Sequence, residues 1–236
     1  MSVAAKESAA REMVVITGAN RGIGLALAAE LARAGKRVIG ACRAPGRARE
    51  LAALAGAVDV RELDVADEGS VARFVASLAH EPVDVLVCNA GVGGGGHQAV
   101  ADMDYGAWRE AFEVNTIAPF RLATALLPNL RRSARPRILA LSSQMASLQR
   151  KSVGAYAYRS SKAALNKVMQ VLAVELARDG IVVCPIHPGW VRTDMGGPGA
   201  ELSVEASAQG LHALIESLGP EHSGRFWTWD GREHPW

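Results

Sequence analysis

Long apolar runs are missing from this chain of 236 residues. No stretch approaches the roughly 18 apolar residues that are needed to cross a bilayer. The start, MSVAAKESAARE (1–12), carries charges where a secretion signal needs an apolar segment. We therefore expect a cytoplasmic protein with no membrane partner.

An excess of charge of either sign is also absent. The sequence has 26 basic and 24 acidic residues, which give a formal net charge of +2. Such a balanced surface has no strong field for nucleic acid or anionic lipid, so we expect neither as a partner. Cysteine is scarce as well: Cys42, Cys88 and Cys184 are far apart and lie in or beside apolar stretches. This spacing excludes a disulfide framework and predicts reduced core residues, and no metal site is expected.

What the sequence does contain is an alternation of short apolar strands and longer helices. Strands are predicted at 13–18, 37–42, 59–63, 83–91, 137–143 and 181–189, with a last one near Trp227, and helices at 25–35, 68–79, 105–130, 157–178 and 203–218. This order predicts an α/β fold, a three-layer doubly wound Rossmann fold with a mostly parallel sheet of about seven strands. Because the chain has no repeat and no linker, we expect one domain over 1–236.

The segment TGANRGIG (17–24) places three glycines between the first predicted strand and the first helix. A glycine-rich turn at that point offers backbone amides and a helix N-terminus to a diphosphate. The spacing G-x-x-x-G-x-G therefore indicates a nucleotide-binding loop, with a purely structural turn as the alternative. A second glycine-rich stretch, GVGGGGHQ (91–98), is interpreted as a flexible loop within the domain.

Charge near the first loop indicates which dinucleotide would bind. An acidic residue about 20 positions beyond the glycines binds the ribose 2′-hydroxyl of NAD, whereas arginine there accepts the 2′-phosphate of NADP. The corresponding position holds Cys42, Arg43 follows it, and Arg21 lies inside the loop. Two guanidinium groups with no carboxylate beside them favour NADP(H) over NAD(H). The alternative is that Arg43 is a solvated loop residue.

The segment YRSSK (158–162) places Tyr158 and Lys162 four residues apart on one face of a predicted helix. A free tyrosine, with a pKa near 10, is a poor proton shuttle at neutral pH. The ammonium group, together with the positive nicotinamide ring of a bound cofactor, is predicted to lower that pKa by roughly two units or more. Ser143 ends the strand at 137–143, at the sheet edge where open α/β folds bind ligands. Ser142 and Ser147 are alternative hydroxyl donors.

Asn115 lies within the helical pattern at 105–130, and Pro119 follows it four residues later. Proline has no amide hydrogen, so the carbonyl of Asn115 loses its helical donor and is free to hold a water. A simple proline kink is the alternative interpretation.

Taken in order, these segments resemble the short-chain dehydrogenase/reductase family over nearly the whole chain. CNAG (88–91) is similar to the family's N-N-A-G, with Cys88 in place of the first asparagine, and HPGWVRTDM (187–195) is similar to its Pro-Gly segment. The short interval between Thr193 and the helix at 203–218, the segment YAYRSSKAALN (156–166) and the ending DGREHPW (230–236) together resemble the subgroup that contains the C-factor signalling proteins and sniffer-type carbonyl reductases. That interval predicts an open substrate site, and Trp190 lies either beside the substrate or in packing.

The resemblance implies an NADPH-dependent oxidoreductase that transfers a hydride between nicotinamide and a carbonyl or alcohol substrate. In it Tyr158 is the general acid/base, Ser143 polarises the carbonyl, Lys162 assists the tyrosine and holds the ribose, and Asn115 supports a water chain. The implied cofactor contacts are Gly18, Asn20, Arg21, Gly22, Ile23, Gly24, Arg43, Asp64, Val65, Asn89, Ala90, Gly91, Tyr158, Lys162, Pro188, Gly189, Val191 and Thr193.

The resemblance also implies a homodimer or homotetramer, and the helix at 161–177 is apolar around much of its circumference, as expected if it packs on both a sheet and a second subunit. The alternative to an enzyme is an NADP(H)-binding signalling or regulatory protein of the C-factor type with little or no turnover. Fold alone does not separate these two functions.

Overall fold

The computed structural model describes residues 11–236 and contains a seven-stranded sheet in the order β3-β2-β1-β4-β7-β8-β9. The strands are β1 (Met13–Thr17), β2 (Arg37–Cys42), β3 (Val58–Glu62), β4 (Val85–Cys88), β7 (Arg137–Leu141), β8 (Val182–His187) and β9 (Trp227–Thr228). All neighbouring strands in this sheet pair in parallel, which confirms the predicted doubly wound fold. The start of the chain, for which we expect no secretion signal, lies outside the described residues except for Arg11 and Glu12.

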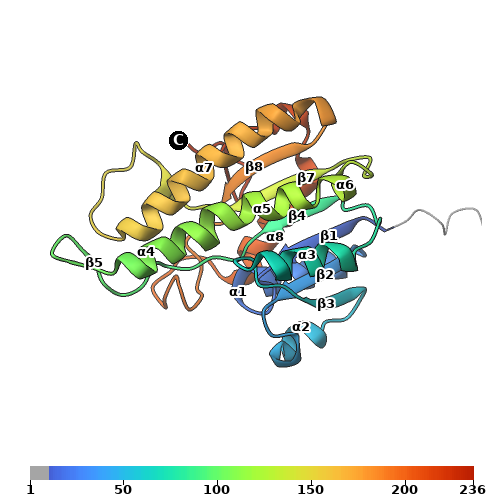
Figure 1. Ribbon diagram of the computed structural model, residues 1–236, viewed down its shortest axis with the longest axis horizontal. Coiled ribbons are helices and arrows are strands. Elements are labelled where there is room, and N and C mark those ends of the chain that lie inside the picture. The colour runs from blue at the N-terminus through green and yellow to red at the C-terminus, as the bar shows by residue number, and fades with distance from the viewer. Residues whose placement is uncertain (1–10) are drawn as a thin grey trace, which may run out of the picture.

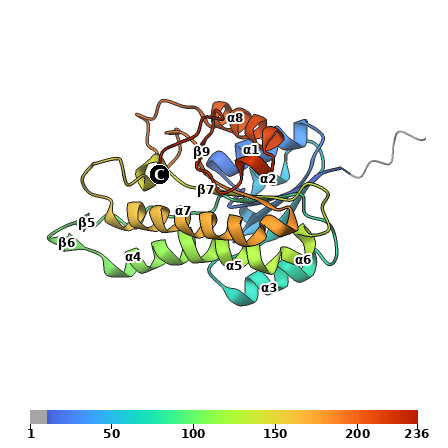
Figure 2. The same cartoon turned by 90° about the horizontal axis from the view of Figure 1, so that it is seen from above.

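Helices cover both faces of the sheet (Figure 1, Figure 2). One face packs against α3 (Glu68–Ser77), α5 (Ala118–Ala125) and α7 (Tyr156–Leu176). The other face packs against α1 (Gly22–Arg33), α8 (Val204–Ser217) and the short α2 (Arg49–Ala52). The two helical layers and the sheet between them are the three layers that the alternation of elements predicts.

Alternate residues of each strand face opposite layers, so the strands are apolar throughout. In β1, Val15 packs with the α3–α5–α7 layer, whereas Val14 and Ile16 pack with the α1–α8 layer, and all three are fully buried. Full burial of one such side chain contributes about 1.5–3 kcal/mol to folding. Burial of these side chains holds both helical layers against the sheet. The polar residues that follow the strands lie together at the carboxyl edge of the sheet.

The long helix predicted at 105–130 is interrupted. It consists of α4 (Tyr105–Phe112), a wide π-helical turn (Glu113–Ile117), α5, and the short α6 (Leu127–Leu130). Pro119 offers no amide hydrogen to the carbonyl of Asn115, and the π turn lies directly before it. The prediction of one continuous helix was wrong for this reason.

The glycine-rich stretch after β4, which is predicted to be a flexible loop, is closely packed at two of its glycines. Gly94 has φ +83°, and a Cβ placed on it would lie 2.6 Å from the Cβ of Ala157 in α7. Gly95 has φ +80°, and a Cβ there would lie 2.9 Å from the Cβ of Ala107 in α4. Glycine allows this backbone to approach two helices. The stretch leads into an antiparallel hairpin of β5 (Gln98–Ala99) and β6 (Asp102–Met103), which the sequence analysis did not predict.

Three further properties concern the molecule as a whole. Within residues 11–236, no helix is both long and apolar enough to span a bilayer. Cys42, Cys88 and Cys184 are free and buried, as predicted. The same part of the chain holds no cluster of His, Cys, Asp and Glu side chains suited to a metal ion.

Candidate functional site

A cavity of about 1110 Å³ opens at the carboxyl edge of the sheet. It brings together most of the predicted cofactor residues, although they come from six separate parts of the chain. These are Gly18, Asn20, Arg21, Gly22, Ile23, Arg43, Asp64, Val65, Asn89, Ala90, Gly91, Tyr158, Lys162, Pro188 and Thr193. Such convergence at the strand ends is the arrangement in which open α/β sheets bind dinucleotides.

The first loop needs its glycines because of close contacts. Gly18 has φ +63°, and a Cβ on it would lie 3.0 Å from the Cα of Ala90. Gly24 lies beneath the loop, and a Cβ there would be 2.5 Å from Nδ2 of Asn89 and 2.6 Å from the Gly18 carbonyl oxygen. Gly24 therefore contributes by allowing close packing and does not line the cavity itself.

Thr17 and Asn89 join the first loop to the end of β4. The Thr17 hydroxyl accepts from the amides of Asn89 and Ala90, both at 3.0 Å. The Asn89 side chain donates to the carbonyl oxygens of Thr17, at 2.7 Å, and Gly18, at 3.1 Å. These four bonds hold the two cavity walls together, and none of them uses the position at which Cys88 replaces the family's asparagine.

Two predicted cofactor residues after β8 pack away from the cavity. Gly189 has φ +90°, and a Cβ on it would lie 2.2 Å from Cδ1 of Leu202. Val191 is buried and forms a bridge with Leu202. Both shape the turn that brings Thr193 to the cavity, and neither lines it.

Arg21 forms an ion pair that the sequence did not reveal. Its Nη1 lies 2.6 Å from Oδ2 of Asp194, and both side chains are exposed. The prediction that no carboxylate lies beside the arginines is therefore wrong, because Asp194 reaches the loop from 173 positions later in the chain. Arg47 also lines the cavity near Arg43, and the arginine-rich segment at 43–49 was its only sequence signal.

Tyr158 and Lys162 lie on the first turns of α7, at one end of the cavity. Burial raises the pKa of Tyr158, and a hydrogen bond with Ser143 lowers it in part. Burial also lowers the pKa of Lys162 to about 8. Lys162 Nζ is 5.9 Å from the centre of the Tyr158 ring and donates to the Leu141 carbonyl at 2.6 Å. In the protein alone the pKa of Tyr158 is thus raised and not lowered as predicted, because burial outweighs the opposing effect of the Ser143 hydroxyl.

The three candidate serines have different partners. Ser142 donates to Oδ1 of Asn166 at 2.6 Å, and Ser147 donates to the carbonyl oxygen of Trp236 at 3.0 Å. Ser143 is the one whose hydroxyl acts on Tyr158, lowering its pKa, and that hydroxyl also accepts from the amide of Met145. Of the three hydroxyls, that of Ser143 is thus placed beside the tyrosine.

Asn115 is completely buried in the π turn and supports the end of β4. Its Oδ1 accepts from the amide of Val92 and its Nδ2 donates to the carbonyl of the same residue, both at 2.9 Å. A Cβ on Gly91 would lie 3.1 Å from Asn115 Oδ1 and 3.5 Å from Lys162 Nζ. Asn115 and Lys162 thus border the same residue of the cavity wall.

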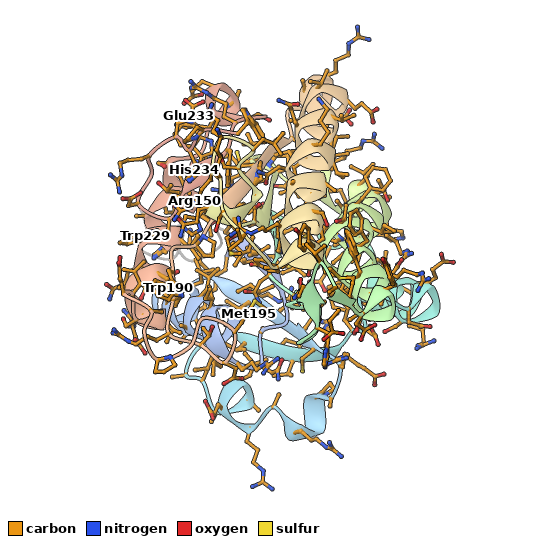
Figure 3. The ribbon with its side chains drawn as sticks, turned by 90° about the vertical axis from the view of Figure 1, so that its left-hand side faces the viewer. Arg150, Trp190, Met195, Trp229, Glu233 and His234 are labelled. Carbon is orange, nitrogen blue, oxygen red and sulfur yellow. The ribbon has the colours of Figure 1, made fainter. Side chains whose placement is uncertain are left out.

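A partly exposed apolar surface lies beside the cavity. Trp190 and Met195 are 47% and 55% exposed, so both are accessible, although Nε1 of Trp190 is bonded to the carbonyl of Gly196. Figure 3 shows them on the face that also carries Arg150, Trp229 and His234. The hydrogen bond to Gly196 shows one packing contact of Trp190, and its place beside the substrate stays a prediction.

Comparison with known proteins gives matches over most of the chain. A family model described as short chain dehydrogenase matches residues 12–201. The C-signal protein of Myxococcus xanthus is 44% identical over 164 residues, which cover 69% of this chain and 98% of that protein. The carbonyl reductase Sniffer of D. melanogaster has a TM-score of 0.88 at 31% identity, covering 96% of this chain and 100% of that one. The NADPH-bound carbonyl reductase from chicken fatty liver has a TM-score of 0.89 at 32% identity, with 96% and 99% covered.

Proposed function

The chain belongs to the short-chain dehydrogenase family of oxidoreductases. On this premise we propose that it is an NADPH-dependent carbonyl reductase, which transfers a hydride between the nicotinamide and a carbonyl or alcohol substrate. The observation that carries the proposal is that Tyr158 and Lys162 line one cavity of about 1110 Å³ together, with the Ser143 hydroxyl beside Tyr158.

The residues present fit a dinucleotide with a 2′-phosphate. Gly18 and Gly22 of the loop at the start of α1 line the cavity, and a helix N-terminus favours a diphosphate. Arg21, Arg43 and Arg47 line the cavity and supply positive charge for the 2′-phosphate, and Cys42 stands where NAD-binding sites carry an acid. NADP(H) is therefore the proposed cofactor, in preference to NAD(H), and when bound it supplies the hydride.

Tyr158 is the proposed proton donor for reduction. Burial raises its pKa, so the hydroxyl keeps its proton at neutral pH and has it available for the oxygen of the substrate carbonyl. The carbonyl carbon gains a hydride and the oxygen gains this proton, so the product is an alcohol. The ammonium group of Lys162 stabilises the tyrosinate that is left behind.

Ser143 and Asn115 have supporting roles in this proposal. The Ser143 hydroxyl is hydrogen-bonded with Tyr158, and a substrate oxygen placed between them receives a second hydrogen bond as its negative charge develops. Asn115 holds the backbone of Val92 and lies against the same part of the cavity wall as Lys162. It is therefore the proposed support for the water chain through which Tyr158 regains its proton.

The test is the loss of NADPH absorbance with a panel of aldehydes, ketones and quinones. Tyr158→Phe removes the proton donor, and we expect kcat to fall by about 10²- to 10⁴-fold while NADPH binding is retained. Ser147→Ala is the matched control, because this serine lies nearby but bonds to Trp236. Turnover that is indifferent to Tyr158 would contradict the proposal.

The similarity to C-signal supports a second candidate function, which the same experiment tests. A signalling or regulatory protein that binds NADP(H) would bind NADPH tightly and show no turnover across the panel. The paired Tyr158 and Lys162 favour the enzyme, because a sensor does not need a matched proton donor.

The remaining proposals concern the whole protein. We propose that cofactor and substrate bind within one domain over 1–236, that the protein acts in the cytoplasm, and that it forms a homodimer or homotetramer. Exposed apolar side chains on α5 and α7 support the last of these, since they form a surface that a second copy would cover.

A further inference from the structure

Gln98, the first residue of β5, bonds to two segments at once through its side-chain amide. Its Nε2 donates to the carbonyl oxygens of Gly93, at 2.9 Å, and Gly95, at 3.0 Å. Its Oε1 accepts from the backbone amides of Ala157, at 2.9 Å, and Tyr158, at 3.4 Å. The amide therefore ties the glycine-rich stretch after β4 to the first turn of α7, and the β5–β6 hairpin lies beside that turn (Figure 1, Figure 2).

The first turn of α7 has no cap of its own. The first amides of a helix have no partner within it, and a Ser, Thr, Asp or Asn side chain just before the helix usually accepts from them. Ala155 stands at that position, with φ +51° and no side-chain acceptor. Gln98 supplies the missing acceptor from 59 positions earlier in the chain. The start of α7 is thus held by a residue of another element.

This contact acts close to the proton donor. Ala157 and Tyr158 are the second and third residues of α7, so the capped amides include that of the tyrosine itself. The glycine-rich stretch packs directly on the same turn, because a Cβ on Gly94 would lie 2.6 Å from the Ala157 Cβ. The stretch begins at Gly91, which lines the cavity. Gln98 therefore fixes Tyr158 relative to the cavity wall.

The residue type also matters. A carboxylate would cap the helix equally well, but it has no hydrogen to donate to the carbonyls of Gly93 and Gly95. It would also place a negative charge near Tyr158, whose hydroxyl becomes an anion when it gives up its proton. A neutral amide supplies both the acceptor and the donors without that charge.

We propose that Gln98 is a positioning residue for Tyr158, holding the first turn of α7 against the cavity wall so that the hydroxyl keeps its place for proton transfer. The proposal rests on the proposed function, in which Tyr158 is the proton donor.

The test compares Gln98→Ala and Gln98→Glu with the wild-type protein. In Gln98→Ala the contact is lost, and we expect kcat to fall about tenfold while the Kd for NADPH is unchanged. This is less than the roughly 100-fold loss of rate that a misplacement of about 1 Å can cause. In Gln98→Glu the added charge favours protonated Tyr158 and Lys162, so the alkaline limb of the kcat profile moves to higher pH. Gln170→Ala and Gln170→Glu, farther along α7 where Gln170 accepts from Lys167, are the matched controls, and neither change is expected to alter kcat.

A second measurement does not depend on turnover. The chain has three tyrosines, so carbon-13 labelling of the ring carbon that bears the hydroxyl gives few resonances, and Tyr158→Phe identifies the one of interest. We expect both Gln98 variants to shift the Tyr158 resonance and leave that of Tyr105 in place. A shifted resonance in a protein without turnover would support the positioning role and refute the proposed reductase.

The opposite results would overturn the proposal. If the Gln98 variants melt at a lower temperature but keep the wild-type kcat per folded molecule, pH profile and Tyr158 resonance, then Gln98 only stabilises the fold. An equal response of the Gln170 variants would lead to the same conclusion.

Discussion

Lys162 is the residue whose ionisation sets the upper pH limit of the proposed reaction. Burial lowers its pKa to about 8, and the nearby Cys88 opposes this in part. Above that pH the amine is neutral and no longer stabilises the Tyr158 anion. We therefore expect kcat for NADPH-dependent reduction to fall as the pH rises through about 8, measured in overlapping buffers at saturating NADPH. A constant kcat well above that pH would contradict this assignment.

The same ionisation affects stability in the opposite direction. The folded-state pKa of Lys162, about 8, lies below the ordinary value of 10.5. Between these two values the unfolded chain binds more protons than the folded one. The contribution of Lys162 to the free energy of unfolding therefore rises with pH across this window. Above pH 8, kcat should therefore fall while the contribution of Lys162 to stability rises. A lower rate in that range can then be assigned to loss of the ammonium group and not to unfolding.

At the scale of elements, the Arg21–Asp194 pair joins the loop before α1 to the segment between β8 and α8. Both side chains are exposed, so the pair contributes at most about 1 kcal/mol. Asp194 competes with a 2′-phosphate for the same guanidinium group. We expect Asp194→Asn to tighten NADPH binding by up to about fivefold, because about 1 kcal/mol corresponds to that ratio, and to leave NADH binding nearly unchanged.

Fluorescence titration of both nucleotides measures this effect. In the Arg21→Ala background, Asp194→Asn should change the NADPH Kd much less than it does in the wild-type background. In the wild-type background, high salt should make the effect of Asp194→Asn on the NADPH Kd smaller. An equal change for NADPH and NADH would mean that Asp194 acts on the shape of the segment, without competing for the phosphate.

The elements differ in how far the sequence predicts them. The seven strands of the main sheet and the covering helices other than the short α2 follow from periodic apolar residues, which are local signals. The break before Pro119 also has a local cause, since Pro119 offers no amide hydrogen to the Asn115 carbonyl, although the wide π turn itself was not predicted. The packing of Gly94 depends on Ala157 in α7, and no local pattern contains that information. The same holds for the residues of the site. The motifs predict Tyr158 and Lys162, but the hydrogen bonds of Gln98 and the raised pKa of Tyr158 arise from contacts and burial in the folded protein.

At the scale of the whole molecule, an apolar surface on α5 and α7 indicates self-association. Ile117, the last residue of the π turn, and Phe120 in α5 are each 44% exposed, while Val171 and Val174 are 45% and 75% exposed on α7. The two helices lie side by side (Figure 1, Figure 2). Each pair is spaced three residues apart, so its members share one helix face. A second copy that packs on this surface would remove these side chains from water.

We expect light scattering after size exclusion to give a dimer or tetramer for the wild-type protein. Val174→Asp and Phe120→Asp place a charge in the proposed interface and should shift the mass toward the monomer, because an unpaired buried charge is costly. Val100→Asp is the control: this side chain is 86% exposed between β5 and β6, away from α5. A monomeric wild-type protein, or a Val100 variant that dissociates as readily as the other two, would exclude this surface as the interface. Because the cavity is formed within one chain, monomeric variants should retain NADPH binding, so that loss of assembly and loss of the site can be told apart.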